Sequence, residues 1–385
     1  MTFRTQINTV ISQSNLALWQ TQRCLVRAPN GRLWALYVGP PDYADTSDLL
    51  VAYSDDDGLT WTEEVAVANA HFAWAYEGMS LLVNSASVPI IIWTYDVSTF
   101  ATEAIKYVSR AGGAWGIPET VHAQAGISWL HACIDSTDVI HIAYKRAGTN
   151  TPTYITGVSG AWGVPEVIEN VPGNNLEDLV VNSMNEPSVL ILDGTGLYTR
   201  TRTGGVWAAR STAMLGSFQV GYFQMAVDSN DYLHIAARFE EVPFPWDYLI
   251  IYIRQTGAGW QAYVEIDRSA DDWCCPSIQI DSSDNVYIIW QHEMHAAVET
   301  VWWCQVVAGA PGAITVLDAT ILQPAGEPSV FSSLWHRWPV SGVPVATRCP
   351  ACLVLTENGT DADVLYFGAL PSVLTISTLP ATGVT

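Results

Sequence analysis

The sequence contains little positive charge. Of its 385 residues, 16 are basic and 38 are acidic, so the formal net charge is −22. Only two of the basic residues are lysines, Lys106 and Lys145. A surface this acidic repels phosphate backbones and anionic lipid headgroups. The composition therefore predicts no nucleic-acid partner.

Long hydrophobic runs are also missing. The run "YLIIYI" (248–253) has the length of a strand, whereas a membrane-spanning helix needs about 18 or more apolar residues. The start of the chain has no basic segment followed by an apolar block, which a signal peptide would show. We therefore predict no membrane span and no signal peptide, and the localisation stays open between a virion surface and release outside the cell.

Cysteine does not indicate a disulfide framework. The seven cysteines are an odd number, and several lie inside apolar strand-like runs, where buried free thiols are the usual state. Cys349 and Cys352 form an isolated CxxC, but a structural zinc site needs four ligands. We predict no resident metal or cofactor, with a bound Ca²⁺ as the one exception left open.

What the sequence does contain is aromatic and β-branched residues without helical periodicity. It has 17 Trp and 16 Tyr, and nearly half of its residues are apolar. Such residues favour strands. The expected fold class is therefore all-β.

A repeat organises these strands. The segment "AGGAWGIPETV" (111–121) recurs as "VSGAWGVPEVI" (158–168), and more loosely at 202–212 and 256–266. The tryptophans that align in these copies, together with one in an earlier stretch, are spaced 45 to 54 residues apart. They are Trp61, Trp115, Trp162, Trp207 and Trp260. Two further copies carry proline in place of Trp, which brings the predicted number of units to seven.

A second series runs in phase with the first. "IDSTDVIHIAY" (134–144), "VDSNDYLHIAA" (227–237) and "IDSSDNVYIIW" (280–290) share Asp-Ser-x-Asp followed by an apolar run. Asp, Ser and Asn reverse the chain by bonding their own backbone. Each unit thus has four antiparallel strands, which is typical of a β-propeller blade.

We therefore predict one domain, 1–385, forming a β-propeller with seven four-stranded blades, and six blades as the alternative. Residues 1–20 are expected to complete or cover the closure of the ring. The approximate blades are 21–67, 77–122, 129–169, 177–213, 222–266, 275–318 and 329–378.

The stretch "SDDDGLTW" (54–61) joins the third and fourth strands of the first unit. It matches the pattern Ser-x-Asp-x-Gly-x-Thr-Trp at Ser54, Asp56, Gly58, Thr60 and Trp61. It therefore resembles the Asp box of the sialidase-like (BNR-repeat) propellers. The resemblance implies a structural turn in which Ser and Asp tie the backbone and Trp packs between blades, so it identifies the fold and does not locate a site.

The predicted site lies on the other face, where long acidic and aromatic loops join strands two and three and link successive blades. Aromatic rings there can stack on sugars, and polar groups can bind hydroxyls. The ligand-binding candidates are Trp74, Tyr76, Tyr95, Trp246, Asp247, Asp272, Trp273, Trp335, Arg337 and Trp338.

A sialidase needs three arginines for the substrate carboxylate, a Tyr–Glu nucleophile pair and an acid/base Asp. The segment "QRCLVRAPNGRLWALYVG" resembles the family's first such arginine segment and places Arg23 at the arginine position. Asp42 or Asp45 would match the acid/base. No motif identifies the other arginines or the nucleophile pair, so the catalytic residues stay unknown beyond these weak candidates.

These observations favour a non-catalytic β-propeller that binds a glycan or receptor. A glycan-facing chain without an export signal fits a phage tail or virion surface component, with a carbohydrate or glycosylated surface and other virion proteins as partners. The alternative is a carbohydrate-active enzyme of the sialidase-like or polysaccharide-lyase type. A lyase would need a His or Tyr base and an Arg that neutralises the uronate. The candidates are His71, His336, Arg337, Tyr43 and Tyr95, but no motif identifies which of them would act.

Overall fold

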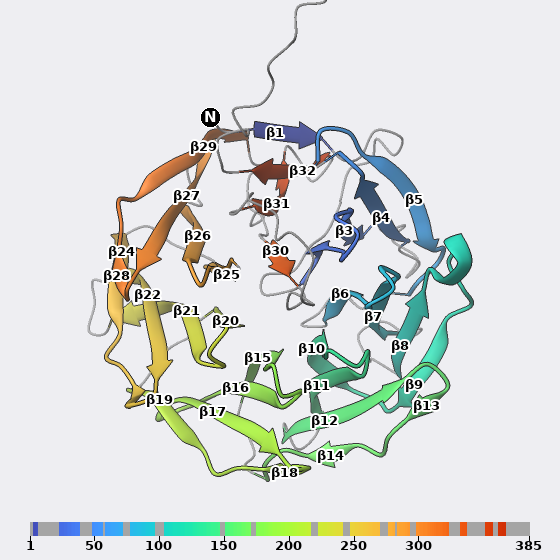
Figure 1. The fold of residues 1–385 in the computed structure, drawn as a ribbon, viewed down its shortest axis with the longest axis horizontal. Coiled ribbons are helices and arrows are strands. Elements are labelled where there is room, and N and C mark those ends of the chain that lie inside the picture. Colours follow the sequence, from blue (N-terminus) through green and yellow to red (C-terminus); the bar gives the residue numbers. More distant parts are fainter. Residues whose placement is uncertain are drawn as a thin grey trace, which may run out of the picture.

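The computed structural model shows strands arranged in a ring around a central axis (Figure 1). It describes residues 3–6, 23–38, 48–56, 58–71, 78–96, 104–146, 151–170, 175–216, 222–241, 247–269, 276–281, 283–292, 298–322, 332–336, 351–356 and 361–366. Side chains are described for those residues that fall within 23–239, 248–268, 276–290 and 301–315.

The strands form six sheets. One has four strands, β6 (Met79–Val83), β7 (Pro89–Tyr95), β8 (Ala104–Ser109) and β9 (Glu119–Ala123). A second sheet contains β10 (Ile127–Ile134), β11 (Ile140–Arg146), β12 (Thr151–Val158), β13 (Ala161–Trp162) and β14 (Glu166–Val167). A third contains β15 (Asn175–Val181), β16 (Pro187–Asp193), β17 (Gly196–Thr203), β18 (Val206–Trp207) and β19 (Ser211–Leu215).

The next two sheets repeat this pattern. The first of them contains β20 (Phe223–Val227), β21 (Leu233–Glu241), β22 (Asp247–Thr256), β23 (Gly259–Trp260) and β24 (Val264–Ser269). The second contains β25 (Ser277–Ile280), β26 (Val286–His292), β27 (Val298–Val307), β28 (Ala310–Pro311) and β29 (Thr315–Leu322). In each five-stranded sheet the last two short strands both pair with the third strand, as β13 and β14 do with β12. They are one interrupted fourth strand.

The sixth sheet joins the two ends of the chain. Its order is β1-β32-β31-β30-β2-β3-β4-β5. Its strands are β1 (Phe3–Gln6), β2 (Leu25–Arg27), β3 (Leu33–Val38), β4 (Leu49–Ser54), β5 (Thr62–Val67), β30 (Ser332–His336), β31 (Ala351–Thr356) and β32 (Asp361–Tyr366). β1 pairs antiparallel with β32, and β2 pairs parallel with β30.

This sheet therefore consists of two antiparallel groups of four strands, joined where β2 meets β30.

The all-β prediction is confirmed, because the described residues contain no α-helix and their one helical element is the 3₁₀ turn η1 (Ala111–Gly113). The count of seven blades stays a prediction, since the pairing places the first and last groups in a single sheet.

The repeat register is confirmed for four tryptophans. In four units the residue after the repeat tryptophan donates its backbone N–H to a carbonyl of the third strand, at 2.8 to 3.0 Å. The tryptophans are Trp115, Trp162, Trp207 and Trp260. The donors are Gly116, Gly163, Ala208 and Gln261. Gly312, which follows Pro311, makes the same bond to Gln305. In the five-stranded sheets this contact lies where the fourth strand is interrupted.

The core lies between neighbouring sheets. The second strands are apolar on both faces because both faces are covered, and β3 is buried along its whole length. Trp34, Trp93 and Trp290 are among the largest fully buried side chains. Trp162 donates its indole N–H to Glu119 of the preceding sheet at 2.6 Å. The repeat tryptophans thus fill and fasten the boundaries between sheets.

The two faces of the ring differ. We call the face with the tight turns between first and second strands the turn face; its turns include 84–88, 135–139, 182–186 and 228–232. We call the opposite face, where each inner strand begins, the mouth face. The inner strands are β2, β6, β10, β15, β20, β25 and β30.

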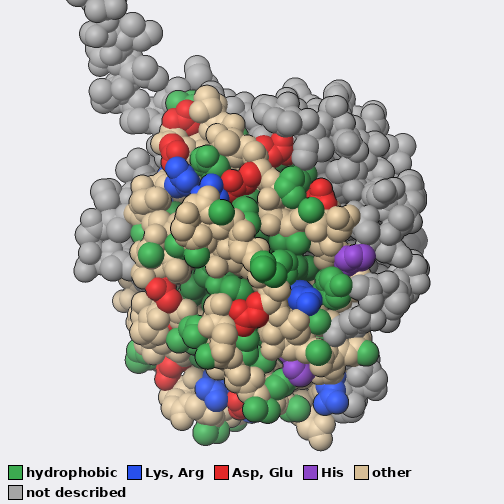
Figure 2. Space-filling model, turned by 90° about the vertical axis from the view of Figure 1, so that its right-hand side faces the viewer, with side chains coloured by type: hydrophobic (Ala, Val, Ile, Leu, Met, Phe, Trp, Pro, Cys, Tyr) green, Lys and Arg blue, Asp and Glu red, His purple; other side chains and the backbone are tan. Residues whose placement is uncertain are grey.

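The turns of the turn face are linked to one another. The backbone N–H and hydroxyl of Ser85 bond the two carboxylate oxygens of Asp138 in the next turn. Ser183 bonds Asp231 in the same way. The outer rim, seen from the right-hand side of Figure 1, carries hydrophobic side chains scattered among polar ones and charges of both signs (Figure 2).

Candidate functional site

Polar side chains link the inner strands near the axis. Ser80 Oγ accepts the backbone N–H of Ala132 at 3.2 Å. Gln224 Oε1 accepts the N–H of Ile278 at 2.8 Å, and Asp178 Oδ2 accepts that of Met225 at 2.7 Å. In each case a side chain of one inner strand satisfies a backbone donor of the next. Inner strands in neighbouring sheets are not paired as a ladder, so these bonds replace ladder bonds.

Arg23 crosses the centre of this ring. Its backbone bridges Ser80 on β6, but its guanidinium reaches β15 and β20 on the other side of the axis. Nη2 donates to both carboxylate oxygens of Asp178 at 3.0 Å, and Nη1 donates to the carbonyl of Leu179 at 2.7 Å. Arg23 is only 4% exposed. The Arg23 side chain therefore lies across the axis of the ring at this level.

His131 lies beside this pair. Its Nδ1 is 3.6 Å from Asp178 Oδ1, but burial and the charge of Arg23 lower the pKa of His131 to about 3. The imidazole is therefore neutral at neutral pH. Burial raises the pKa of Asp178, while Arg23 and the backbone N–H groups of Met225 and Leu179 oppose that rise. The resulting balance is one buried ion pair, Arg23–Asp178.

Above this level, two inner strands contain bulges. The β10–β11 pairing shifts register between Ser128 and His131, and Trp129 within the shift has a φ of 52°. The β15–β16 pairing shifts between Leu176 and Asp178, which leaves Glu177 as the extra residue. Bulges re-aim side chains and are common beside functional sites. A bulky residue at positive φ is strained, so Trp129 is held there by its surroundings.

Lys145 and Glu177 lie together at these bulges. Lys145 is half-buried at the mouth end of β11, pairs with Ser128 in the ladder, and donates from Nζ to Asn175 Oδ1 at 2.9 Å. Glu177 is 1% exposed, and its Oε2 has no hydrogen-bond partner among the described residues. Burial raises the pKa of Glu177 to about 8, against the effect of Lys145. Burial also lowers the pKa of Lys145.

Arg238 occupies the position in β21 that Lys145 occupies in β11. His141 and His234 make the same bonds in the two sheets: Nδ1 lies 2.6 Å from a tyrosine hydroxyl and Nε2 3.2 to 3.3 Å from an aspartate. Lys145 and Arg238 each follow their histidine by four residues. The guanidinium of Arg238 lies 4.3 Å from the Tyr248 ring centre, so it is packed against an aromatic ring in a buried position.

A third group at the mouth end includes two residues predicted from the sequence. The rings of His71 and Tyr95 meet edge to face with centres 5.5 Å apart. The Lys106 ammonium lies 4.7 Å from the Tyr95 ring centre and donates to Thr120 Oγ1 at 2.8 Å. The arrangement brings an imidazole, a phenol and a cation together on one sheet.

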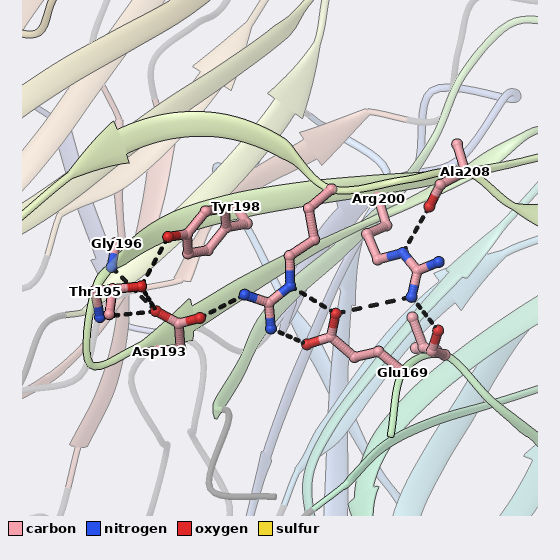
Figure 3. A network of polar contacts seen from close by, with 9 residues as sticks. Glu169, Asp193, Thr195, Gly196, Tyr198, Arg200 and Ala208 are labelled. Carbon is pink, nitrogen blue, oxygen red and sulfur yellow. Dashed lines mark hydrogen bonds and ion pairs between the residues drawn. The ribbon is translucent and has the colours of Figure 1, made fainter. Parts of the chain in front are cut away.

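Arg200 and Arg210 form a network with two carboxylates. Arg210 bonds Glu169 through Nε at 2.8 Å and Nη2 at 2.7 Å, and it bonds Asp193 at 2.5 Å through Nη1 (Figure 3). Arg200 joins the same network through Glu169, 3.7 Å away. The two arginines and two carboxylates balance each other across the boundary between neighbouring sheets. This network fastens the fold and leaves little charge for a ligand.

The turn that resembles an Asp box is tied as the resemblance implies. Asp56 accepts the backbone N–H of Thr60 at 2.8 Å and its hydroxyl at 2.6 Å. Ser54 Oγ accepts the N–H of Gly58 at 2.6 Å, and Gly58 has a φ of 84°. Burial raises the pKa of Asp56, but the bonds from Thr60 and Ser54 outweigh it and lower that pKa. Trp61 bonds the carbonyl of Gly58 at 3.1 Å.

Most of the predicted ligand-binding and catalytic residues lie outside the described part of the chain. For Asp247 in β22 and Trp335 in β30 the backbone is described and the side chain is not. Those wholly outside are Asp42, Asp45, Trp74, Tyr76, Trp246, Asp272, Trp273, Arg337 and Trp338. Their roles stay predictions. Among the predicted ligand-binding, catalytic and lyase-base candidates, those with described side chains are Arg23, His71 and Tyr95.

Sequence reasoning did not find the residues that the structure places at the mouth. Trp129, Lys145, Asn175 and Glu177 lie in strands that otherwise read as core. One signal was available: "NLEDLVV" (175–181) places two adjacent acids in an apolar inner strand, and Lys145 is one of only two lysines. Acids in such a run are rarely buried unless paired.

Within the described residues no group of three His, Cys, Asp or Glu side chains is placed to hold a metal ion. In that same part of the chain, no helix has the length and apolar character needed to cross a membrane.

Comparison with known proteins identifies the fold. No protein-family model matches the sequence, and no curated protein matches it. The structure resembles a PL25 ulvan lyase bound to -[GlcA(1-4)Rha3S]-, with a TM-score of 0.64, 10% identity, and coverage of 91% of this chain and 94% of that one. It also resembles the polysaccharide lyase Uly1 (TM-score 0.55, 8% identity, 94% and 91% covered).

The NanB sialidase from Streptococcus pneumoniae matches with a TM-score of 0.43, 12% identity, and coverage of 94% of this chain and 70% of that one. At such identities the likeness to the lyases shows a shared fold.

Proposed function

We propose that this chain is a polysaccharide-binding β-propeller that takes an acidic sugar chain at the mouth of its central funnel. The observation that carries the proposal is the position of Lys145. The molecule has a net charge of −22, yet one of its two lysines lies half-buried at the mouth end of β11, the second strand of its sheet, where Asn175 is its one hydrogen-bond partner among the described residues. A cation without a salt bridge in this part of the chain favours an anionic ligand.

Two further features support this proposal. The Arg23–Asp178 pair lies across the axis of the ring, so a ligand bound at the mouth face would not pass through it. Both of the polysaccharide lyases that share the fold act on polysaccharides, and one was solved with a glucuronate-containing sugar.

The experiment is a direct binding measurement. Isothermal titration calorimetry would compare cello-oligosaccharides with their C6-oxidised, uronate-bearing counterparts of equal length. We expect the oxidised oligomer to bind and the neutral one to bind more weakly. Absence of binding by both would contradict the proposal.

The second candidate function is catalysis of the polysaccharide-lyase type. The grouping of His71, Tyr95 and Lys106 favours it, because β-elimination needs a base near a cation that stabilises the uronate carboxylate. Turnover would appear as ultraviolet absorbance of the unsaturated product from the same oxidised oligomers. Loss of that signal in Tyr95→Phe, with binding retained, would assign the residue; binding without any absorbance change would leave a pure binder.

The role as a virion or tail component, inferred from the sequence, stays a separate proposal. Its test is mass spectrometry of purified particles that carry the gene.

A further inference from the structure

A cation, a phenol and an imidazole meet where the β6–β9 sheet faces the strands β2 to β5. The Lys106 ammonium lies 4.7 Å from the centre of the Tyr95 ring, and the His71 ring meets the same ring edge to face at 5.5 Å. Tyr95 ends β7, Lys106 lies near the start of β8, and His71 lies in the link from β5 to β6. All three side chains are partly exposed. The group is therefore open to solvent at the mouth face.

The strand register explains why these side chains meet. The β7–β8 ladder pairs Trp93 with Lys106, and Tyr95 follows Trp93 by two residues, so the three side chains share one face of the sheet. Trp93 packs in the hydrophobic cluster formed largely by β2 to β5. This face is therefore turned toward the strands from which the link carrying His71 departs.

Lys106 is held in place without being neutralised. Its Nζ donates to Thr120 Oγ1 at 2.8 Å and packs against the Tyr95 ring. An ammonium has three N–H donors, and one of them is engaged with Thr120. Among the described residues no carboxylate forms a salt bridge with Lys106. Two neutral contacts thus fix the position of a cation whose remaining donors can meet an anion, and such preorganisation favours binding.

His71 is held by an unusual backbone conformation. Its φ is 48°, in the left-handed region that residues other than glycine seldom adopt. The carbonyl of Ala70 accepts the indole N–H of Trp93 at 3.2 Å, and the carbonyl of His71 accepts the backbone N–H of Asp96 at 2.8 Å. Nδ1 of His71 is buried without a hydrogen-bond partner among the described residues, so Nε2 is the ring nitrogen left for a ligand. Backbone strain of this kind is common where a protein clamps a ligand.

We propose that Lys106, Tyr95 and His71 form a carboxylate subsite for one acidic sugar of the bound chain. Lys106 pairs with the carboxylate, while the Tyr95 hydroxyl and His71 Nε2 bond hydroxyl groups of the same sugar. This inference rests on the proposed function, and it gives the acidic chain a second cation, on the sheet next to that of Lys145. The subsite requires binding and no turnover, which distinguishes it from the catalytic role considered above.

The test uses the full chain and the two matched oligomers named above. For Lys106→Met we expect affinity for the uronate oligomer to fall about tenfold, with the neutral oligomer unaffected. Lys106→Arg keeps the charge and should lose less affinity than Lys106→Met. Tyr95→Phe should weaken both oligomers. Arg32→Met, on the turn face, is the control and should change neither. Equal effects of Lys106→Met on both oligomers would overturn the subsite.

The scarcity of lysine allows a direct test on the wild type. The chain has two lysines, so a sample labelled with carbon-13 lysine should give two side-chain Cε signals in NMR. Either Lys106→Arg or Lys145→Arg assigns the pair, since each removes one signal. We expect the uronate oligomer to shift the Lys106 signal of the wild type and the neutral oligomer to leave it in place. A Lys106 signal that the uronate oligomer does not move would overturn the subsite.

These outcomes separate the two proposals. If neither oligomer binds the wild type, the proposed function fails and the subsite with it. If the uronate oligomer is preferred but Lys106→Met leaves that preference unchanged and the Lys106 signal does not shift, the subsite alone fails.

Discussion

The guanidinium of Arg23 lies 3.0 Å from both carboxylate oxygens of Asp178, across the axis of the ring. The two residues are 155 positions apart and exposed by 4% and 1%. Their pair links the inner strands that begin the chain to those in its middle. A sialidase would direct such an arginine at its substrate; here the group is already bound to a carboxylate and to the carbonyl of Leu179.

Removing one member of this pair should strongly destabilise the fold. We expect Asp178→Ala to lower the free energy of unfolding by about 3 to 5 kcal/mol, because it leaves the Arg23 charge buried without a partner. Urea denaturation followed by tryptophan fluorescence measures the change. The double variant Arg23→Met/Asp178→Leu should recover part of the loss, since no uncompensated charge remains.

The control for that experiment is the exposed pair Arg32–Asp55, where Asp55 is 63% exposed. Asp55→Ala should cost less than about 1 kcal/mol. If Asp178→Ala costs as little as Asp55→Ala, the pair across the axis does not hold the ring together.

The links between turns give a second prediction. Asp138 has a φ of 68° and accepts two bonds from Ser85 at 2.8 and 2.5 Å. Asp138→Ala removes both bonds and places alanine in the left-handed region, so we expect a loss of about 1 to 3 kcal/mol. Asp138→Asn should cost much less, because Asn tolerates this φ and the equivalent Asn185 accepts bonds from Ser136. Chemical denaturation of both variants decides; equal losses would contradict a geometric role.

The turn that resembles an Asp box should act on stability alone. Asp56→Ala removes the acceptor for Thr60 and Ser54 and should cost about 1 to 2 kcal/mol, with binding of the uronate oligomer unchanged. Thermal melting and calorimetric titration of the same sample provide both readings. Unchanged melting together with lost binding would place the ligand on the turn face instead of the mouth.

The fold was largely predictable because its signals are local. The spacing of Trp115, Trp162, Trp207 and Trp260 reflects a bond that recurs one residue after each of them, so the sequence repeat and the structural repeat coincide. The Asp-Ser-x-Asp turns recur for the same reason: Asp135 and Asp228 both accept backbone N–H groups within their own turns. Local rules of this kind can be read along one chain.

The mouth was less predictable because it depends on contacts between distant residues. Nothing in "HIAYKRAG" shows that Lys145 meets Asn175 on the next sheet, and nothing in "NLEDLVV" shows a bulge at Glu177. Loop composition drew attention to tryptophans such as Trp246 and Trp273, which lie outside the described residues. The alignment of Arg23 with a catalytic arginine stays a prediction, and it could not show that Asp178 binds Arg23.

The last prediction concerns acid and the boundary between two sheets. Glu119 accepts the indole N–H of Trp162 at 2.6 Å, the backbone N–H of Gly160 at 2.8 Å and the hydroxyl of Ser159 at 2.8 Å. Burial raises the pKa of Glu119, but these three bonds outweigh it and lower that pKa below its ordinary value. The folded state thus holds the carboxylate more firmly ionised than the unfolded chain does.

A lowered pKa in the folded state means that the stabilisation is complete above the unfolded value, about 4.3, and is lost as the pH falls through the folded value. Glu119→Gln keeps an acceptor oxygen but does not titrate. We therefore expect the wild type to be more stable than Glu119→Gln near neutral pH, and this difference to shrink as the pH falls below about 4. Urea unfolding at a series of pH values measures it. A difference that stays constant with pH, or grows on acidification, would show that Trp162 does not depend on the charge of Glu119.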